Sequence, residues 1–232
     1  NRDLHSFPTR RSSDLIDAFA TRLNPMREGI NGAIRADFWG YIAPADPRTA
    51  AVLAHREASL NMVKNGLYGS MFVAGCISGA LSRNPTVASI LACGLSVIPA
   101  ASRLAEVVRQ VDVWYREDRD WTVTCDRIYA RYGHLPFAGA LNNLAMVVLA
   151  LLHGQLDFTR SITTAVMCGM DTDCNSGTVG SIVGAAGGIE HIDSRWIEPF
   201  HDQIRTCAAQ YTYGSISDLV ERTVRVHDRL MT

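Results

Sequence analysis

Two aspartates separated by one residue stand in a short polar stretch that lies between an apolar segment and a glycine-rich one: Gly169-Met170-Asp171-Thr172-Asp173-Cys174-Asn175-Ser176-Gly177-Thr178. In a loop, carboxylates at positions i and i+2 can point toward one place. Two negative charges so close together need a cation, or one of them must take a proton. Their oxygen atoms favour a hard ion such as Mg²⁺ or Mn²⁺, and no pair of His or Cys nearby indicates zinc.

A second interpretation is that Asp171 and Asp173 only cap the helix that follows them. The spacing leaves a metal site and a pair of helix caps open as alternatives. An EF-hand is excluded, because the twelfth position counted from Asp171 is Ile182, where a calcium loop needs Glu. The positive N-terminal end of the following helix would keep the acids ionised and favour a pyrophosphate nearby.

The segments that must position these residues have the apolar spacing of helices. The most complete apolar stripe comprises Leu104, Val107, Val108, Val111, Trp114 and Tyr115. Helix boundaries are indicated at Asp46-Pro47, at Gly154 followed by Asp157, and at Ser215 with Asp218. Clean alternation of apolar and polar residues is nearly absent. We therefore predict a compact, multi-helix all-α fold with essentially no sheet.

Two of the predicted helices contain an unusual number of glycines. One contains Gly66, Gly69, Gly75 and Gly79, and the other contains Gly180, Gly184, Gly187 and Gly188. Each glycine inside a helix costs about 1 kcal/mol relative to alanine, so repeated glycines indicate that another backbone or a ligand comes close. For the first group we favour close packing of helices.

The composition fits one globular domain. The chain has 232 residues, 47% of them hydrophobic, and a formal net charge of -1, which argues against binding nucleic acid through bulk charge. Residues 84–102 and 133–156 have no Asp, Glu, Lys or Arg, but prolines and amides interrupt them. We expect buried helices there and no membrane span. The six cysteines form no zinc or disulfide pattern, which predicts a reducing, cytoplasmic location.

Residues 1–15 differ from the rest of the chain, because they are basic, rich in serine and without helical periodicity. We interpret them as a foreign or disordered extension and place the domain at residues 16–232. On this interpretation the natural protein enters the sequence part-way along its length.

Several segments resemble the ADP-ribosylglycohydrolase family, in particular the dinitrogenase reductase-activating glycohydrolase type. The most specific part runs from Asn142-Asn143 through His153-Gly154 and Asp157-Phe158 to residues 167–175 and 180–185. Residues 30–40 resemble a family segment that is rich in glycine and asparagine, and residues 64–69 resemble another recurrent stretch. The similarity extends over nearly all of residues 16–232.

The resemblance implies an all-α fold with two Mg²⁺ or Mn²⁺ ions in a central cleft. Such a protein cleaves the N- or O-glycosidic bond that joins ADP-ribose to a modified protein side chain or a small conjugate. Asp171 and Asp173 would be metal ligands, with Thr172 and Cys174 adjacent. A thiol is a poor ligand for a hard ion, so we expect Cys174 beside the metal. The expected substrate contacts are Asn31, Gly32, Arg35, Asn142, Asn143 and Gly177. For Asn142 and Asn143, support of a nearby loop and ordinary burial are alternatives.

The chain also departs from the family pattern. The N-terminal half of the family site should bring a Gly-Asp motif with a nearby Glu and a Thr-Asp-Asp run, and these 232 residues contain neither. Two near-octahedral ions need about a dozen ligand positions. We therefore expect a truncated chain that is inactive alone and whose catalytic residues lie in the missing part. Asn61-Met62 also replaces a frequent Ser-His pair, and Gly139-Ala140 a frequent His-Thr pair.

Three functions follow as alternatives. The first is a metal-dependent ADP-ribosyl hydrolase. The second is a non-catalytic relative that binds ADP-ribose or serves a crystallin-like structural role. The third is a helical scaffold in which the two aspartates are only caps.

Overall fold

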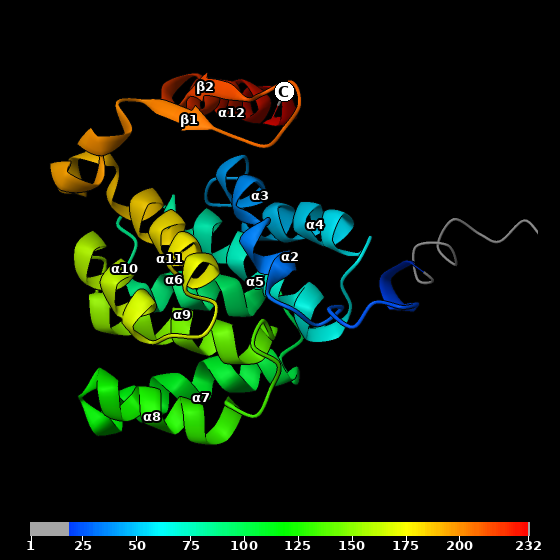
Figure 1. The fold of residues 1–232 in the computed structure, drawn as a ribbon, viewed down its shortest axis with the longest axis vertical. Coiled ribbons are helices and arrows are strands. Elements are labelled where there is room, and N and C mark those ends of the chain that lie inside the picture. The colour runs from blue at the N-terminus through cyan, green and yellow to red at the C-terminus, as the bar shows by residue number, and fades with distance from the viewer. Residues whose placement is uncertain (1–18, 232) are drawn as a thin grey trace, which may run out of the picture.

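The structure, a computed structural model, describes residues 19–231 and is built mainly of helices (Figure 1). The principal elements are α2 (Asn31–Ile34), α3 (Asp37–Tyr41), α4 (Pro47–Ala58), α5 (Lys64–Ala80), α6 (Val87–Ser96), α7 (Arg103–Asp118), α8 (Trp121–Tyr132), α9 (Ala140–Gly154), α10 (Phe158–Met167), α11 (Thr172–Gly187), β1 (Gln203–Arg205), β2 (Tyr213–Ser215) and α12 (Ile216–Met231). The all-α prediction is confirmed. The segment 1–15, predicted to be foreign, lies outside the described residues.

Helix α9 lies at the centre of the fold. Every residue of α9 except His153 is buried. Helices α7 and α8 pack on one side of it, and α10 and α11 pack on the other (Figure 1). A helix that is apolar on all faces is stable in water only when neighbours cover those faces. The uncharged stretch at residues 133–156 therefore contains the central core helix.

Helix α5 is a second core helix and packs against α2, α3, α4 and α6. Two buried serines of α5 fasten the N-terminal elements to it. The Ser70 hydroxyl donates a hydrogen bond to the carbonyl of Gly32 at 3.0 Å, and the Ser78 hydroxyl donates to the carbonyl of Ala43 at 2.5 Å. These bonds fix α2 and the end of α3 against the core.

Three of the predicted helix starts show the expected capping bonds. The carboxylate of Asp46 accepts from the N–H of Thr49 at 3.1 Å, and that of Asp157 accepts from the N–H of Arg160 at 2.7 Å. At α12 the Ser215 hydroxyl oxygen accepts from the Asp218 N–H at 3.0 Å. Such bonds satisfy amides that have no partner within the helix.

The end of α9 has a different cause from the one that the sequence indicated. The helix ends at Gly154, as predicted, but the residue with left-handed backbone is Gln155, with φ 50°. Gly154 is needed for packing, because a Cβ atom there would collide with Ser161 of α10. The glycine thus allows α10 to pack close to α9.

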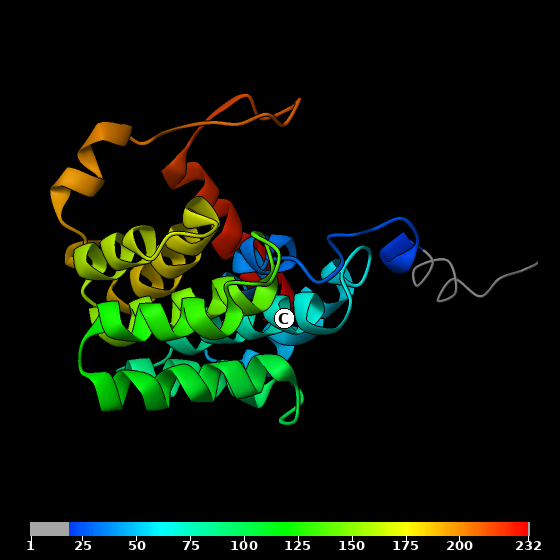
Figure 2. The same cartoon turned by 60° about the horizontal axis from the view of Figure 1, so that its bottom comes forward.

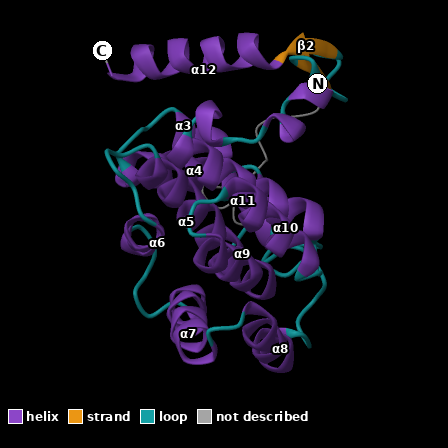
Figure 3. Cartoon of the chain, turned by 90° about the vertical axis from the view of Figure 1, so that its left-hand side faces the viewer, coloured by secondary structure: helices purple, strands orange, loops and turns teal. Residues whose placement is uncertain are grey.

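The C-terminal part is a small hairpin followed by a long helix. The short 3-10 helices η1 (Ile189–His191), η2 (Ser194–Trp196) and η3 (Glu198–Phe200) lead to antiparallel β1 and β2, in which Ile204 pairs with Gly214. The hairpin stands clear of the helical body (Figure 2). Helix α12 lies along one end of the molecule, beside α3 (Figure 3). The His227 ring nitrogen Nδ1 lies 3.0 Å from the carbonyl oxygen of Ile42 and ties α12 to the body.

Within the part of the chain that the structure describes, none of the helices combines the length and the apolar character that crossing a bilayer requires. The other uncharged stretch, residues 84–102, contains α6, whose buried side is formed by Val87, Ile90, Leu91 and Gly94.

The glycines of α5 differ in their surroundings from Gly180 and Gly184 of α11, whereas Gly187 lies close to His191. A Cβ on Gly66 would lie 2.8 Å from the carbonyl oxygen of Arg27, and one on Gly79 would lie 2.7 Å from the Cβ of Cys93. The predicted close packing of helices is confirmed at Gly79, which meets α6, whereas Gly66 meets the loop at Arg27 and Glu28. In α11, by contrast, a Cβ on Gly180 or Gly184 would have no neighbour closer than 3.7 Å. Packing within the described residues does not explain these α11 glycines.

This contrast predicts opposite effects of one substitution. Gly180→Ala should raise the free energy of unfolding by about 0.5–1 kcal/mol, because alanine is the better helix former and its methyl group fits. Gly66→Ala should lower it by about 1–3 kcal/mol, because backbone atoms of Arg27 and Glu28 occupy the space. Urea unfolding followed by circular dichroism measures both changes. A neutral Gly66→Ala would contradict the packing that we describe.

Candidate functional site

The chain enters α11 through a turn with unusual backbone angles. Gly169 has φ 75° and Met170 has φ 59°, so two consecutive residues are left-handed. Glycine is required at the first position, because a Cβ there would lie 2.6 Å from the hydroxyl oxygen of Tyr129. That hydroxyl donates a hydrogen bond to the carbonyl of Cys168 at 2.8 Å. A left-handed non-glycine residue such as Met170 persists only where its surroundings hold it, which is common at functional sites.

Asp171 follows this turn and occupies the N-cap position of α11, yet its side chain makes no capping hydrogen bond. The carboxylates of Asp171 and Asp173 and the thiol of Cys174 gather instead, with one potential ligand atom from each lying within 4.8 Å of the others. Within residues 19–231 no other group of three His, Cys, Asp or Glu side chains comes close enough to share an ion. The Cys174 backbone N–H still acts on the Asp171 carboxylate and lowers its pKa, so this geometry is compatible with a cap as well as with a place in the cluster.

The two carboxylates have different environments. Burial raises the pKa of Asp171, and the neighbouring Asp173 raises it further. The exposed Asp173 keeps a lowered pKa, chiefly because the Asp171 carboxyl group donates a hydrogen bond to it. Without a cation, Asp171 therefore takes up a proton before Asp173 does as the pH falls, as expected for two close carboxylates.

This donor set fits a hard divalent ion better than a soft one. Two carboxylates supply the oxygen atoms that Mg²⁺ and Mn²⁺ prefer. Burial and the adjacent Asp171 raise the pKa of the Cys174 thiol to about 12, so it is a neutral donor near pH 7. Thr172 is half-buried beside them, and its backbone carbonyl accepts from the hydroxyl of Ser176 at 2.7 Å.

Two consecutive amides at the start of α9 lie beneath this cluster, and both are fully buried. The side-chain oxygen of Asn143 accepts from the backbone N–H of Asp171 at 3.0 Å and from the side-chain amide of Asn175 at 2.9 Å. Its Nδ2 donates to the carbonyls of Phe137 and Gly139, both at 2.8 Å. Asn142 donates to the carbonyl of Pro136 at 3.0 Å. Both predicted substrate contacts are thus engaged with the protein, and support of the loop is the alternative that this geometry favours.

The loop before α9 also holds the start of α2. Gly29 and Gly139 form an isolated antiparallel bridge. The N–H of Ile30 donates to the carbonyl of Ala138 at 2.8 Å, and the N–H of Ala140 donates to the carbonyl of Glu28 at 3.0 Å. Segments more than 100 residues apart in sequence therefore meet here. They place Asn31, exposed at the beginning of α2, on the same side of the core as the α11 turn.

The other α2 residues predicted to contact substrate have protein partners. Gly32 is buried, and a Cβ there would lie 2.9 Å from Cγ of Met62 and 3.0 Å from the carbonyl oxygen of Gly66. The close approach that this glycine permits is therefore to α5. The Arg35 guanidinium lies 2.9 Å from a carboxylate oxygen of Glu57 and donates to Asn61 at 2.9 Å.

Gly177 has more open surroundings. It is exposed one turn after Asp173, and the nearest neighbour of a Cβ there would be Cδ1 of Ile34 at 3.5 Å. Helices α2 and α11 are thus adjacent at this point, with no side chain on α11 between them. A Cβ on Gly177 would meet Ile34 in ordinary van der Waals contact.

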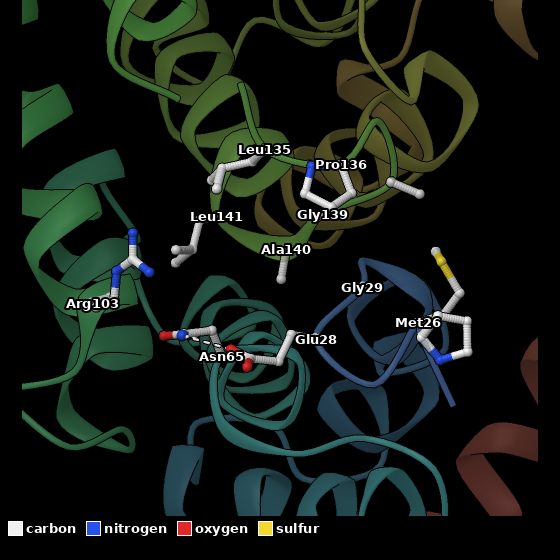
Figure 4. Close-up of a pocket in the computed structure, with 12 residues that line it drawn as sticks. Met26, Glu28, Gly29, Asn65, Arg103, Leu135, Pro136, Gly139, Ala140 and Leu141 are labelled. Carbon is white, nitrogen blue, oxygen red and sulfur yellow. Dashed lines mark hydrogen bonds between the residues drawn. The ribbon is translucent and has the colours of Figure 1, made fainter. Parts of the chain in front are cut away.

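A cavity of about 220 Å³ adjoins the paired loops (Figure 4). Leu135, Pro136 and Leu141 lie on one side of it, and Glu28 and Asn65, joined by a 2.9 Å hydrogen bond, lie on the other. Arg103 supplies a cation at one end. Asp171 and Asp173 do not line this cavity. Its volume is below the roughly 300–1,000 Å³ of typical ligand pockets, so it has room for only part of a nucleotide.

The sequence matches the ADP-ribosylglycohydrolase family over residues 3–229. The chain belongs to this family. A comparison with curated proteins gives no match. ADP-ribosylglycohydrolases act on ADP-ribosylated substrates and are generally metal-dependent, and the acidic cluster before α11 is a group that could hold a metal. The resemblance stated from the sequence is confirmed, while the roles of individual residues stay predictions.

Sequence reasoning missed one buried acid of this ADP-ribosylglycohydrolase. Asp37 of α3 accepts a hydrogen bond from the hydroxyl of Ser181 on α11, and its second oxygen is buried without a partner. Burial raises its pKa to about 6. Burial and the nearby Asp37 charge also raise the pKa of Tyr41 to about 12. The sequence held no signal for this, because Asp37 reads as an ordinary first-turn acid of a short helix.

The raised pKa predicts a pH-dependent stability. The folded chain holds the Asp37 proton more tightly than the unfolded chain does. The free energy of unfolding should therefore fall as the pH rises from about 4 to about 6. Asp37→Asn removes the buried charge and should stabilise the protein by about 2–3 kcal/mol near pH 7. Near pH 4 the advantage should disappear. Urea unfolding at both pH values checks this, and an equal effect at both would contradict it.

Proposed function

We propose that this protein is a metal-dependent hydrolase that releases ADP-ribose from modified protein side chains or from related ADP-ribosyl conjugates. In this proposal Asp171 and Asp173 bind a divalent cation, Mg²⁺ or Mn²⁺. The observation that supports it most is that two carboxylates and a thiol at the start of α11 each offer a ligand atom within 4.8 Å of the others.

The residues around the pair have separate tasks in this proposal. When bound, the cation would hold hydroxyl groups of the distal ribose and lower the pKa of a bound water. The N-terminal end of α11, a 16-residue helix, favours the negative pyrophosphate of the substrate. The exposed Gly177 has no side chain that would meet the substrate, and the loop at 136–139 provides the wall of a cavity for part of the ADP-ribosyl group.

In this proposal the affinity of the site for a cation depends on whether Asp171 is ionised. Because burial and Asp173 raise its pKa, a proton competes with a cation for the pair. Cation binding should therefore release a proton and strengthen as the pH rises. The neutral Cys174 thiol, which donates a hydrogen bond to Asp171, orients that carboxylate in our proposal and does not bind the ion.

Two carboxylates are few ligands for two ions. Near-octahedral coordination of two ions takes about a dozen positions, and the described residues offer one cluster. We propose that this chain binds one cation weakly and does not turn over substrate without further ligands from another segment. The small number of metal ligands also favours the alternative, a non-catalytic ADP-ribose-binding or crystallin-like relative.

Cation binding provides the first test. Electron paramagnetic resonance of Mn²⁺ should show binding by the wild-type chain, and Asp171→Asn should weaken it about 10-fold or more, because one ligand charge is lost. Asp157→Asn is the matched control, since it changes an acid that caps the preceding helix. Asparagine is an equally good cap, so this variant should keep its Mn²⁺ affinity. Equal affinity of all three proteins would contradict the proposed site.

Substrate tests separate the two functions. Calorimetry with ADP-ribose in the presence and absence of Mg²⁺ should show binding that depends on the ion. Release of ADP-ribose from ADP-ribosylated arginine, serine or a small conjugate should occur once a segment that provides the further metal ligands is added. Metal-dependent binding with no release under that condition would support the non-catalytic alternative.

A further inference from the structure

We infer that Asn143 is a positioning residue that sets the place of Asp171, and through it the geometry of the proposed cation site. The inference rests on the function proposed above and assigns to Asn143 a task that requires no contact with substrate. It follows from the hydrogen bonds of this one buried side chain, all of which are made within the protein.

An asparagine side chain can donate two hydrogen bonds and accept two. Asn143 makes all four, at 2.8–3.0 Å, and is fully buried. Its donors hold the carbonyls of Phe137 and Gly139, and its oxygen holds the amides of Asp171 and Asn175. One side chain therefore joins the loop before α9 to the turn before α11.

The neighbouring Asn142 shows that burial alone does not produce this pattern. Asn142 is equally buried, but its side-chain oxygen has no hydrogen-bond partner. Its Nδ2 reaches the carbonyl of Pro136 and, at 3.6 Å, the sulfur of Met170. Asn142 makes no bond to Asp171, so the two consecutive amides have different tasks.

The strained turn explains why Asp171 needs such a partner. The left-handed Met170 lies between two fixed points, the Tyr129 bond to the Cys168 carbonyl and the Asn143 bond to the Asp171 amide. Loss of the second point leaves buried amides and carbonyls unpaired, and the turn is then free to relax. The Asp171 carboxylate would move relative to Asp173, and the site would lose its preorganised shape.

The experiment compares Asn143→Ala with the matched neighbour Asn142→Ala. Mn²⁺ affinity is measured by electron paramagnetic resonance on the full chain, and exchange of the Asp171 backbone amide is measured by NMR. We expect Asn143→Ala to weaken Mn²⁺ binding about 10- to 100-fold, as for other residues that orient a metal ligand. Exchange at Asp171 should become faster while the amides of α7 keep their protection. Asn142→Ala should leave both measurements close to wild type.

Asn143→Asp tests the oxygen by itself. This variant keeps an acceptor for Asp171 and Asn175 but loses donors to Phe137 and Gly139, so the Asp171 amide should exchange more slowly than in Asn143→Ala. Wild-type Mn²⁺ affinity in Asn143→Ala, or equal losses in the two alanine variants, would overturn the inference. Unprotected exchange of the wild-type Asp171 amide would also overturn it, even if no variant folds. Absence of Mn²⁺ binding by the wild type would overturn the proposed cation site together with the inference, whereas wild-type binding without a variant effect overturns the inference alone.

Discussion

Two carboxylates held within reach of one ion repel each other, and the turn before α11 limits how far Asp171 can move away from Asp173. The chain cannot turn away, because Gly169 and Met170 are fixed in left-handed backbone between the Tyr129 and Asn143 hydrogen bonds. Asp171 is half-buried, so water screens its charge only in part. The repulsion is therefore built into the fold, and a cation or a proton between the carboxylates offsets it.

The central helix supports both the core and this arrangement. From Leu144 onward α9 contributes apolar side chains to the core. In its first turn, the amides of Asn142 and Asn143 point toward the neighbouring loops. Buried amides are costly unless they have partners. Asn143 meets that requirement completely, whereas buried oxygens of Asn142 and Asn175 have none among the described residues. The polar layer between α9 and α11 thus contains one amide whose hydrogen bonds are all made and two amide oxygens that have no partner in the described part of the chain.

The sequence predicted the elements better than it predicted their contacts. Apolar spacing and capping residues such as Asp46 and Asp157 located helices, because those signals are local. The acidic pair was found because two carboxylates so close together are unusual. The tasks of Gly32 and Asn143 depend on neighbours from other helices, so no local pattern reveals that one contacts α5 and the other bonds to Asp171. The raised pKa of Asp37 was not predicted for the same reason, since its burial comes from tertiary packing.

The bridge between Gly29 and Gly139 has a consequence for the order in which the protein forms. Contacts across such a long loop are slow to close, whereas α9, α10 and α11 follow one another directly and meet through short connections. During synthesis the segment around residue 29 leaves the ribosome long before its partner does. Helix α2 can pack on α5 first, but its hydrogen bonds to residues 138–140 must wait until the central helix arrives, and this interval is when a chaperone would be most useful.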